Sequence, residues 1–257
     1  MYRIAACALI SFGLLAQDQT IRNSYSIEKE EALGRQLAED LRSRSKPIDS
    51  PIVQAYLERI GQRIASNISN APFSFEFAAI DGVPCRDVPE PAALPGGHIF
   101  VSTNLLLAVR DEAEFAAILA HAMQHVALRH GTRQATRGVA MNYASVPLIF
   151  TGGPCGVSSL TIPAGFMAQR RLDEQEADSA AANTLARAGI DPKSLERYIQ
   201  RTVTNSAHRL AALTAVTEQM PAVATTATSN EFEAAREEVR RLTMSQARAK
   251  EPPTLRR

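Results

Sequence analysis

The sequence predicts a mostly α-helical domain with a small β-sheet. Of its 257 residues, 45% are hydrophobic, but only 5% are aromatic and none is tryptophan. Aliphatic side chains must therefore build the core, which suits close-packed helices. Apolar residues recur at helical spacing over most of the chain, and only two short segments have the patterns of β-strands. Together these observations predict an α+β fold dominated by helices.

The first half is expected to form two helices followed by two strands. Residues 26–42 begin with a serine that can cap a helix and continue with an acidic first turn. Prolines separate this helix from a second amphipathic one over residues 52–66. Phenylalanines alternate with other residues over 72–80, which is the period of a half-buried strand. A Gly- and Pro-rich stretch, 81–97, then leads to a second short strand over 98–102.

The second half is expected to be helical. A helix over 112–130 is apolar on nearly all sides, so we expect it to be central and buried. A long helix over 166–188 is followed by Gly189 at the usual C-terminal position, with Pro192 just beyond. Shorter helices are expected at 103–109, 194–200, 209–219 and 230–248.

The N-terminus has the pattern of a secretory signal peptide. A single arginine precedes an apolar run over residues 4–16, which is shorter than the ~20 residues of a spanning helix. We expect cleavage near Ala16, a polar flexible segment over 17–27, and export to the periplasm or another extracytoplasmic compartment. An uncleaved N-terminal membrane anchor is the alternative, because Leu14 is a poor residue three positions before the cut.

Two cysteines remain after such a cleavage, Cys85 and Cys155. An even pair in an oxidising compartment can form a disulfide, and two buried free thiols fit equally well. The sequence leaves both alternatives open.

The charge balance argues against a nucleic-acid partner. Lys and Arg number 28 against 27 for Asp and Glu, so the net charge is only +1. Nucleic-acid-binding proteins usually have a strong excess of positive charge. No later apolar run approaches the ~18 residues of a spanning segment. Membrane contact is therefore expected only through an uncleaved N-terminus.

Two histidines on the buried helix, His121 and His125, have the spacing of metal ligands. Residues four apart on a helix share one face, so both imidazoles can reach the same ion. Taken alone, the spacing is more often a coincidence of two histidines on one face. However, a nearly all-apolar helix rarely carries two imidazoles on one stripe unless something satisfies their nitrogens. We therefore expect a metal ion, with zinc as the cofactor.

A third ligand is expected from the helix over 166–188. Glu174 and Asp178 lie four apart, so both can point the same way. One carboxylate could bind the metal while the other accepts the N–H of a liganding histidine. The alternative is a solvated acidic face on a surface helix.

These residues resemble a known family. The sequence is similar to the zinc metallopeptidases that include HtpX, BepA and the CAAX prenyl proteases, the forty-eighth metallopeptidase family, which have a gluzincin-type fold with a central HxxxH helix. The matching pieces occur in the family's order at 31–34, 56–57, 60–61, 93–97, 99–101, 111–112, 119–121, 125, 129–130, 174, 176–178 and 189–192.

The resemblance implies a role for each candidate residue. It makes His121, His125 and Glu174 the ligands of one zinc ion and Asp178 the support of that ligand shell. It implies a single metallopeptidase-like domain over 28–248, followed by a disordered tail over 249–257. It also implies a polypeptide partner, held in extended form along a strand edge. The residues that line the cleft would be Gly96, Gly97, His98, Ile99 and Phe100.

One departure from the family pattern concerns the chemistry. The family motif is HExxH, whose glutamate takes a proton from the metal-bound water and passes it to the leaving amine. This chain has Ala122 there, which can do neither, and Glu114 and Glu176 lie at positions from which they cannot replace it. The alanine is either natural, which makes the chain a degenerate peptidase, or an engineered inactivation.

Two functions follow as expectations. The first is an exported zinc metalloendopeptidase that hydrolyses misfolded proteins, weakened or inactive because the general base is lost. The alternative is a non-catalytic zinc-binding homologue that holds polypeptides as a chaperone or assembly factor. Of the other histidines, His98 is expected at the start of an edge strand, either exposed or touching substrate. His130 is expected to hydrogen-bond within the core.

Overall fold

The computed structural model describes residues 23–81, 90–140, 164–204, 206–223 and 228–250. The expected signal peptide, Cys85 and Cys155 lie outside these ranges, as do most of the expected flexible segment and tail. Among the described helices, none has the length and apolar character needed to cross a bilayer.

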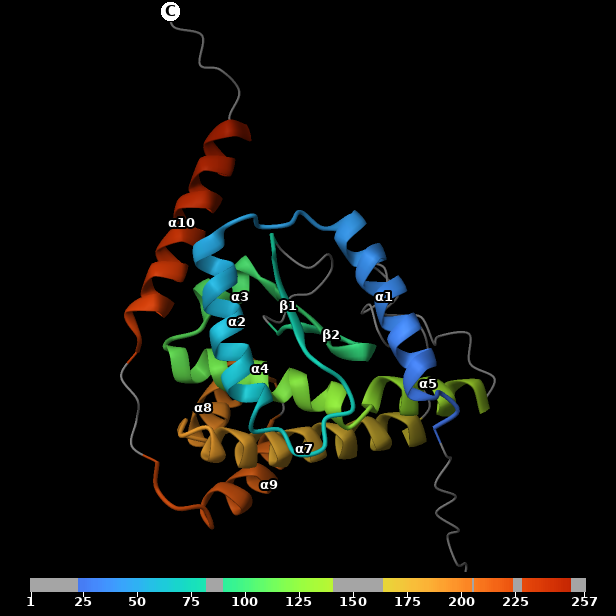
Figure 1. The fold of residues 1–257 in the computed structure, drawn as a ribbon. Helices are drawn as coiled ribbons and strands as arrows, with labels where there is room; N and C mark the ends of the chain where they lie inside the picture. The colour runs from blue at the N-terminus through green and yellow to red at the C-terminus, as the bar shows by residue number, and fades with distance from the viewer. Residues whose placement is uncertain (1–22, 82–89, 141–163, 205, 224–227, 251–257) are drawn as a thin grey trace, which may run out of the picture.

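Helices dominate the described part of the chain, in which three short strands form one sheet (Figure 1). The helices are α1 (Ile27–Arg44), α2 (Pro51–Ala65), α3 (Thr103–Ala108), α4 (Glu112–Ala127), α5 (His130–Ala140), α7 (Ala164–Arg187), α8 (Lys193–Thr202), α9 (Ala207–Thr217) and α10 (Asn230–Lys250). The strands are β1 (Glu76–Ile80), β2 (Ala92–Leu94) and β3 (His98–Ser102), and a 3₁₀ turn, η1 (Pro95–Gly97), joins the last two. The predicted fold class is confirmed.

The central strand of the sheet is β3. It pairs in parallel with β1 on one side and antiparallel with β2 on the other, and all five of its residues are buried. The prediction that His98 begins an edge strand is therefore wrong. β2 has only three residues, too few to show an alternating pattern, so the sequence predicted only a connection in this region.

Helix α4 forms the middle of the molecule (Figure 1). It packs against β2 and η1 on one side and against α7 and α8 on the other. Its residues from Ala113 to Gln124 are buried without interruption, which confirms the prediction of a central buried helix. Asp111 caps the helix, because its Oδ1 accepts the N–H of Glu114 at 2.8 Å.

The expected helix over 112–130 is interrupted after Ala127. Arg129 has a φ of +58°, a left-handed conformation that ends α4 and redirects the chain into α5. Its guanidinium is held by Glu30 at 2.6 Å and by the carbonyl of Tyr25 at 2.6 Å. A long-range ion pair with α1 thus fixes a turn that apolar periodicity alone could not reveal.

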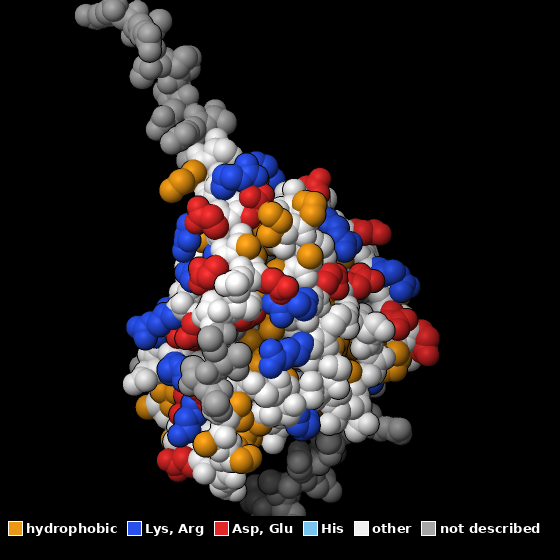
Figure 2. Space-filling view, turned by 60° about the vertical axis from the view of Figure 1, so that its left-hand side comes forward, with side chains coloured by type: hydrophobic (Ala, Val, Ile, Leu, Met, Phe, Trp, Pro, Cys, Tyr) orange, Lys and Arg blue, Asp and Glu red, His pale blue; other side chains and the backbone are white. Residues whose placement is uncertain are grey.

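The surface on the side of α10 carries mixed charges (Figure 2). Basic and acidic side chains are interspersed on this face, and neither sign gathers into one patch. This arrangement agrees with the net charge of +1.

Candidate metal centre

Three side chains from two helices converge on one point. His121 and His125 extend from α4 and Glu174 from α7, and one donor atom of each lies within 4.8 Å of the others. The two Nε2 atoms are 3.1 Å apart, and the Glu174 oxygens lie 3.6 Å from Nε2 of His121 and 3.7 Å from Nε2 of His125. Ligands of a tetrahedral zinc ion are separated by about 3.4 Å, given bonds of about 2.1 Å. The three donors therefore have the spacing of a zinc site with an open fourth position.

The Nδ1 atoms of both rings, which point away from the convergence point, have polar partners. Nδ1 of His121 lies 2.8 Å from Oδ1 of Asp178, and because a carboxylate only accepts, this nitrogen carries the proton. Nδ1 of His125 lies 3.0 Å from Nδ1 of His130. With protons on both outer nitrogens, the Nε2 lone pairs face each other, which is unfavourable unless a cation lies between them. This orientation fits a metal ion.

Arg209 from α9 holds both carboxylates of the site. Its Nε and Nη2 donate to Asp178 at 2.5 and 2.7 Å, and its Nη1 lies 3.1 Å from Oε2 of Glu174. Such a bidentate pair fixes the carboxylate geometrically as well as electrostatically. No local spacing links position 209 to position 178, so sequence reasoning did not assign this contact.

The electrostatics of the two histidines differ. Burial opposes protonation of His121, but the charges of Asp178 and Glu174 outweigh it and raise the pKa of this ring above its usual value. Burial, together with the neighbouring His121, His130 and Arg209, holds the pKa of His125 well below its usual value. Burial would raise the pKa of Asp178, yet Arg209 and His121 outweigh it and keep the carboxyl ionised. The site therefore offers a neutral His125 and a charged Asp178 at neutral pH.

The structure places Ala122 inside the protein, where the residue is 5% exposed. Glu114 is occupied elsewhere, since its Oε2 accepts from Arg201 at 2.5 Å and from the backbone N–H of Arg110 at 2.9 Å. Glu176 is bonded to His130 at 3.1 Å. Glu90, just before β2, is a further carboxylate. Burial alone would lower the pKa of Arg209, but Asp178 above all, then Glu174 and last Glu90, raise it above its usual value.

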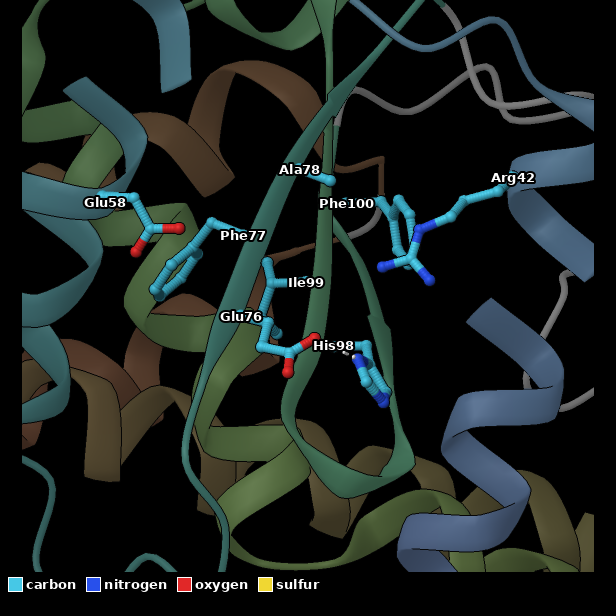
Figure 3. A pocket seen from close by; sticks show the side chains of 8 residues that line it. All are labelled: Arg42, Glu58, Glu76, Phe77, Ala78, His98, Ile99 and Phe100. Carbon is cyan, nitrogen blue, oxygen red and sulfur yellow. Dashed lines mark hydrogen bonds and ion pairs between the residues drawn. The ribbon is translucent and has the colours of Figure 1, made fainter. Parts of the chain in front are cut away.

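The segment expected to line the cleft forms the end of η1 and the start of the central strand β3. Gly96 and Gly97 have φ values of +76° and +99°, which glycine adopts without strain. His98, Ile99 and Phe100 border an open groove at the β1 side of the sheet, where His98 and Glu76 point toward each other at 3.0 Å (Figure 3). His98 is 9% exposed, so it is not the exposed strand histidine that was expected.

Backbone pairing limits what this segment can bind. β3 is hydrogen-bonded to a strand on each side, whereas β2 ends the sheet on the side that packs against α4. The strand edge beside the metal centre is thus β2 rather than β3. A role for residues 96–100 in holding a substrate stays a prediction.

Comparisons with known proteins agree with this geometry. The sequence model of Peptidase family M48 matches residues 51–245. The chain is 26% identical over 192 residues to the beta-barrel assembly-enhancing protease of Yersinia pestis, a match that covers 68% of this chain and 38% of that protein. It is 24% identical over 195 residues to the protein of the same name from Escherichia coli K12, a match that covers 70% of this chain and 38% of that protein.

A putative beta-barrel assembly-enhancing protease of Vibrio cholerae is 27% identical over 192 residues, covering 70% of this chain and 39% of that protein. The match thus spans under two fifths of the length of these relatives. Because the family model covers well over half of the chain, this chain belongs to Peptidase family M48.

Proposed function

We propose that the chain is an exported zinc-binding protein of the M48 family with weak or absent peptide hydrolysis. The observation that carries the proposal is the convergence of two histidine Nε2 atoms and one carboxylate beside an alanine at position 122. The nitrogen and oxygen donors suit zinc, and their outer partners orient them as zinc sites require. Export is supported by the apolar N-terminal run at 4–16.

His121, His125 and Glu174 would hold the ion. When bound, zinc supplies Lewis-acid chemistry that polarises a substrate carbonyl and acidifies a water molecule. Asp178 keeps the His121 ring oriented, and Arg209 holds the carboxylates of Asp178 and Glu174 in place. Position 122 would have to accept and return a proton, and a methyl group can do neither. The loss of such a general acid–base group commonly costs ~10²- to 10⁴-fold in rate.

The partner we propose is a polypeptide in extended form. β2 ends the sheet beside α4, and an edge strand can pair with an added peptide through its backbone groups. The names of the relatives refer to β-barrel assembly, which makes β-barrel proteins the first clients to test.

The decisive experiment compares the purified mature chain with an Ala122→Glu variant. We expect near-stoichiometric zinc in both proteins by metal analysis, and casein cleavage at least ~10²-fold faster in the variant. Comparable cleavage by the two proteins would contradict the inactive assignment, and a Glu90→Gln variant would then test whether Glu90 supplies the base. Absence of bound zinc in both proteins would contradict the metal site itself.

The second function is a non-catalytic polypeptide-binding factor. It is favoured by the same observation, because three possible metal ligands converge while a general base at position 122 is missing. We expect the unmodified chain to reduce light scattering when a urea-unfolded outer-membrane β-barrel protein is diluted into buffer. Equal scattering with and without the chain would argue against this function.

A further inference from the structure

We propose that His130 and Glu176 are positioning residues that hold His125 in the orientation needed for metal binding. The inference rests on the proposed zinc site and adds a second support to the one that Asp178 gives to His121. It concerns a chain of four side chains, which runs from His125 through His130 and Glu176 to Arg133.

The contacts of this chain are short, and they run from the buried His130 to the half-exposed side chains of Glu176 and Arg133. Nδ1 of His125 lies 3.0 Å from Nδ1 of His130, and Nε2 of His130 lies 3.1 Å from Oε2 of Glu176. The same oxygen accepts from Nη1 of Arg133 at 3.2 Å. His130 is 1% exposed, and its ring meets that of His125 edge to face at 4.9 Å between centroids.

The partners determine where the protons lie. Glu176 accepts from Arg133 and is a carboxylate, so the His130 nitrogen that faces it carries a proton. The other nitrogen of a neutral His130 is then an acceptor for the Nδ1–H of His125. This leaves the Nε2 lone pair of His125 directed toward His121 and Glu174, where the metal would bind.

The second support, like the first, takes its carboxylate from α7, whereas its arginine comes from α5 instead of α9. Glu176 and Asp178 both follow the ligand Glu174 on α7, and each is held by an arginine, Arg133 and Arg209 respectively. Two residues of separation turn Glu176 away from Glu174 by about 200° around the helix, so it reaches His130 and not the ion. The left-handed turn at Arg129 brings His130 back beside the end of α4.

The same residues could be mistaken for a second metal site. Donor atoms of His130, Asp173 and Glu176 lie within 4.8 Å of one another. However, the oxygens of Asp173 already have donors, namely Gln134 at 2.9 Å, Gln169 at 3.1 Å and Arg137 at 3.4 Å. The arginines neutralise the carboxylates that would attract a cation. The charge pattern therefore favours a support network over a second ion.

The test measures zinc affinity by competition with a chromogenic chelator in the mature protein. His130→Phe removes both hydrogen bonds, so we expect the dissociation constant for zinc to rise about 10- to 100-fold. His130→Asn keeps an oxygen that can accept from His125 and should lose less affinity. Glu176→Gln retains the side-chain shape, and a rise in its dissociation constant is also expected. Glu237→Gln is the matched control, because it removes an exposed carboxylate paired with Arg240 on α10.

Each outcome separates the positioning role from the zinc site itself. If the unsubstituted protein binds no zinc, the proposed function fails. If it binds one ion but His130→Phe and Glu176→Gln both bind zinc as tightly as Glu237→Gln, only the positioning role is wrong. If the unsubstituted protein binds two zinc ions per chain and Glu176→Gln binds one, the positioning role is wrong and these residues form a second metal site. Should His130→Phe fail to fold, the Glu176→Gln and His130→Asn measurements decide the question.

Discussion

Gly34 of α1 packs directly against the backbone carbonyl of Pro95 in η1. A Cβ atom at position 34 would overlap that carbonyl oxygen and would also crowd the ring of His98. This contact sets how closely α1 approaches the turn that joins β2 to β3. Because the obstructing atoms belong to the backbone, they cannot move aside as a flexible side chain would.

Replacing this glycine tests the close approach. Gly34→Ala gains helix propensity of about 1 kcal/mol, but overpacking against backbone costs more, so we expect a net destabilisation of about 1–3 kcal/mol. Gln36→Ala, on an exposed part of the same helix, is the control and should change stability little. Urea unfolding measures both. A stabilised Gly34→Ala protein would show that α1 does not press on η1.

Breaking the Asp178–Arg209 pair should weaken both folding and metal binding. In Asp178→Asn, the neutral amide leaves the half-buried Arg209 with Glu174 as its one remaining carboxylate and offers His121 an uncharged partner. We expect a loss of several kcal/mol in unfolding free energy and about a 10- to 100-fold loss of zinc affinity. Asp40→Asn, which removes an exposed ion pair with Arg44, is the control. Equal stability and zinc affinity in the two variants would contradict the role of Asp178.

Local patterns predicted the parts of the structure that depend on neighbouring residues. The apolar run of α4 predicted its burial, and the spacing of His121 and His125 predicted a shared face. The break at Arg129 was missed because its cause, Glu30, lies 99 positions away in the chain. The central position of β3 was missed because parallel pairing with β1 follows from the topology of the connection. Arg209 joins the site for a similar reason, since only tertiary packing brings α9 to α7.

The turn at Arg129 should depend on Glu30. This glutamate is 1% exposed, and its second oxygen accepts from Thr132 at 3.0 Å. Glu30→Gln removes the charge that holds Arg129 in its left-handed conformation, so we expect the variant to lose about 2–4 kcal/mol of unfolding free energy. This loss is smaller than the one expected on breaking a fully buried ion pair, because Arg129 is partly exposed. Hydrogen exchange should accelerate first around residues 128–133. Unchanged exchange there would mean that the turn is stable without the ion pair.

Tyr56 should make the protein more sensitive to alkaline pH. Its ring lies between Phe115 and Phe232, at 5.7 and 5.6 Å between centroids. Among the described residues its buried hydroxyl makes no hydrogen bond of normal geometry, and the nearby carboxylate of Glu112 makes at most a weak one. Burial, with the charge of Glu112 adding to it, raises the pKa of this hydroxyl far above the usual value. The folded protein therefore keeps the proton at a pH where the unfolded chain releases it.

The sign of the effect follows from this difference. Below about pH 10, both states hold the proton and Tyr56 adds no pH dependence; above it, unfolding is favoured by up to ~1.4 kcal/mol per pH unit. Tyr56→Phe removes both this dependence and an unsatisfied hydroxyl. We expect the variant to be equal or about 1 kcal/mol more stable at pH 7, with an advantage that grows above pH 10. Urea unfolding at pH 7, 10 and 11 measures the change. A variant that is less stable at pH 7, or whose advantage does not grow with pH, would indicate a hydrogen-bonded hydroxyl at this position.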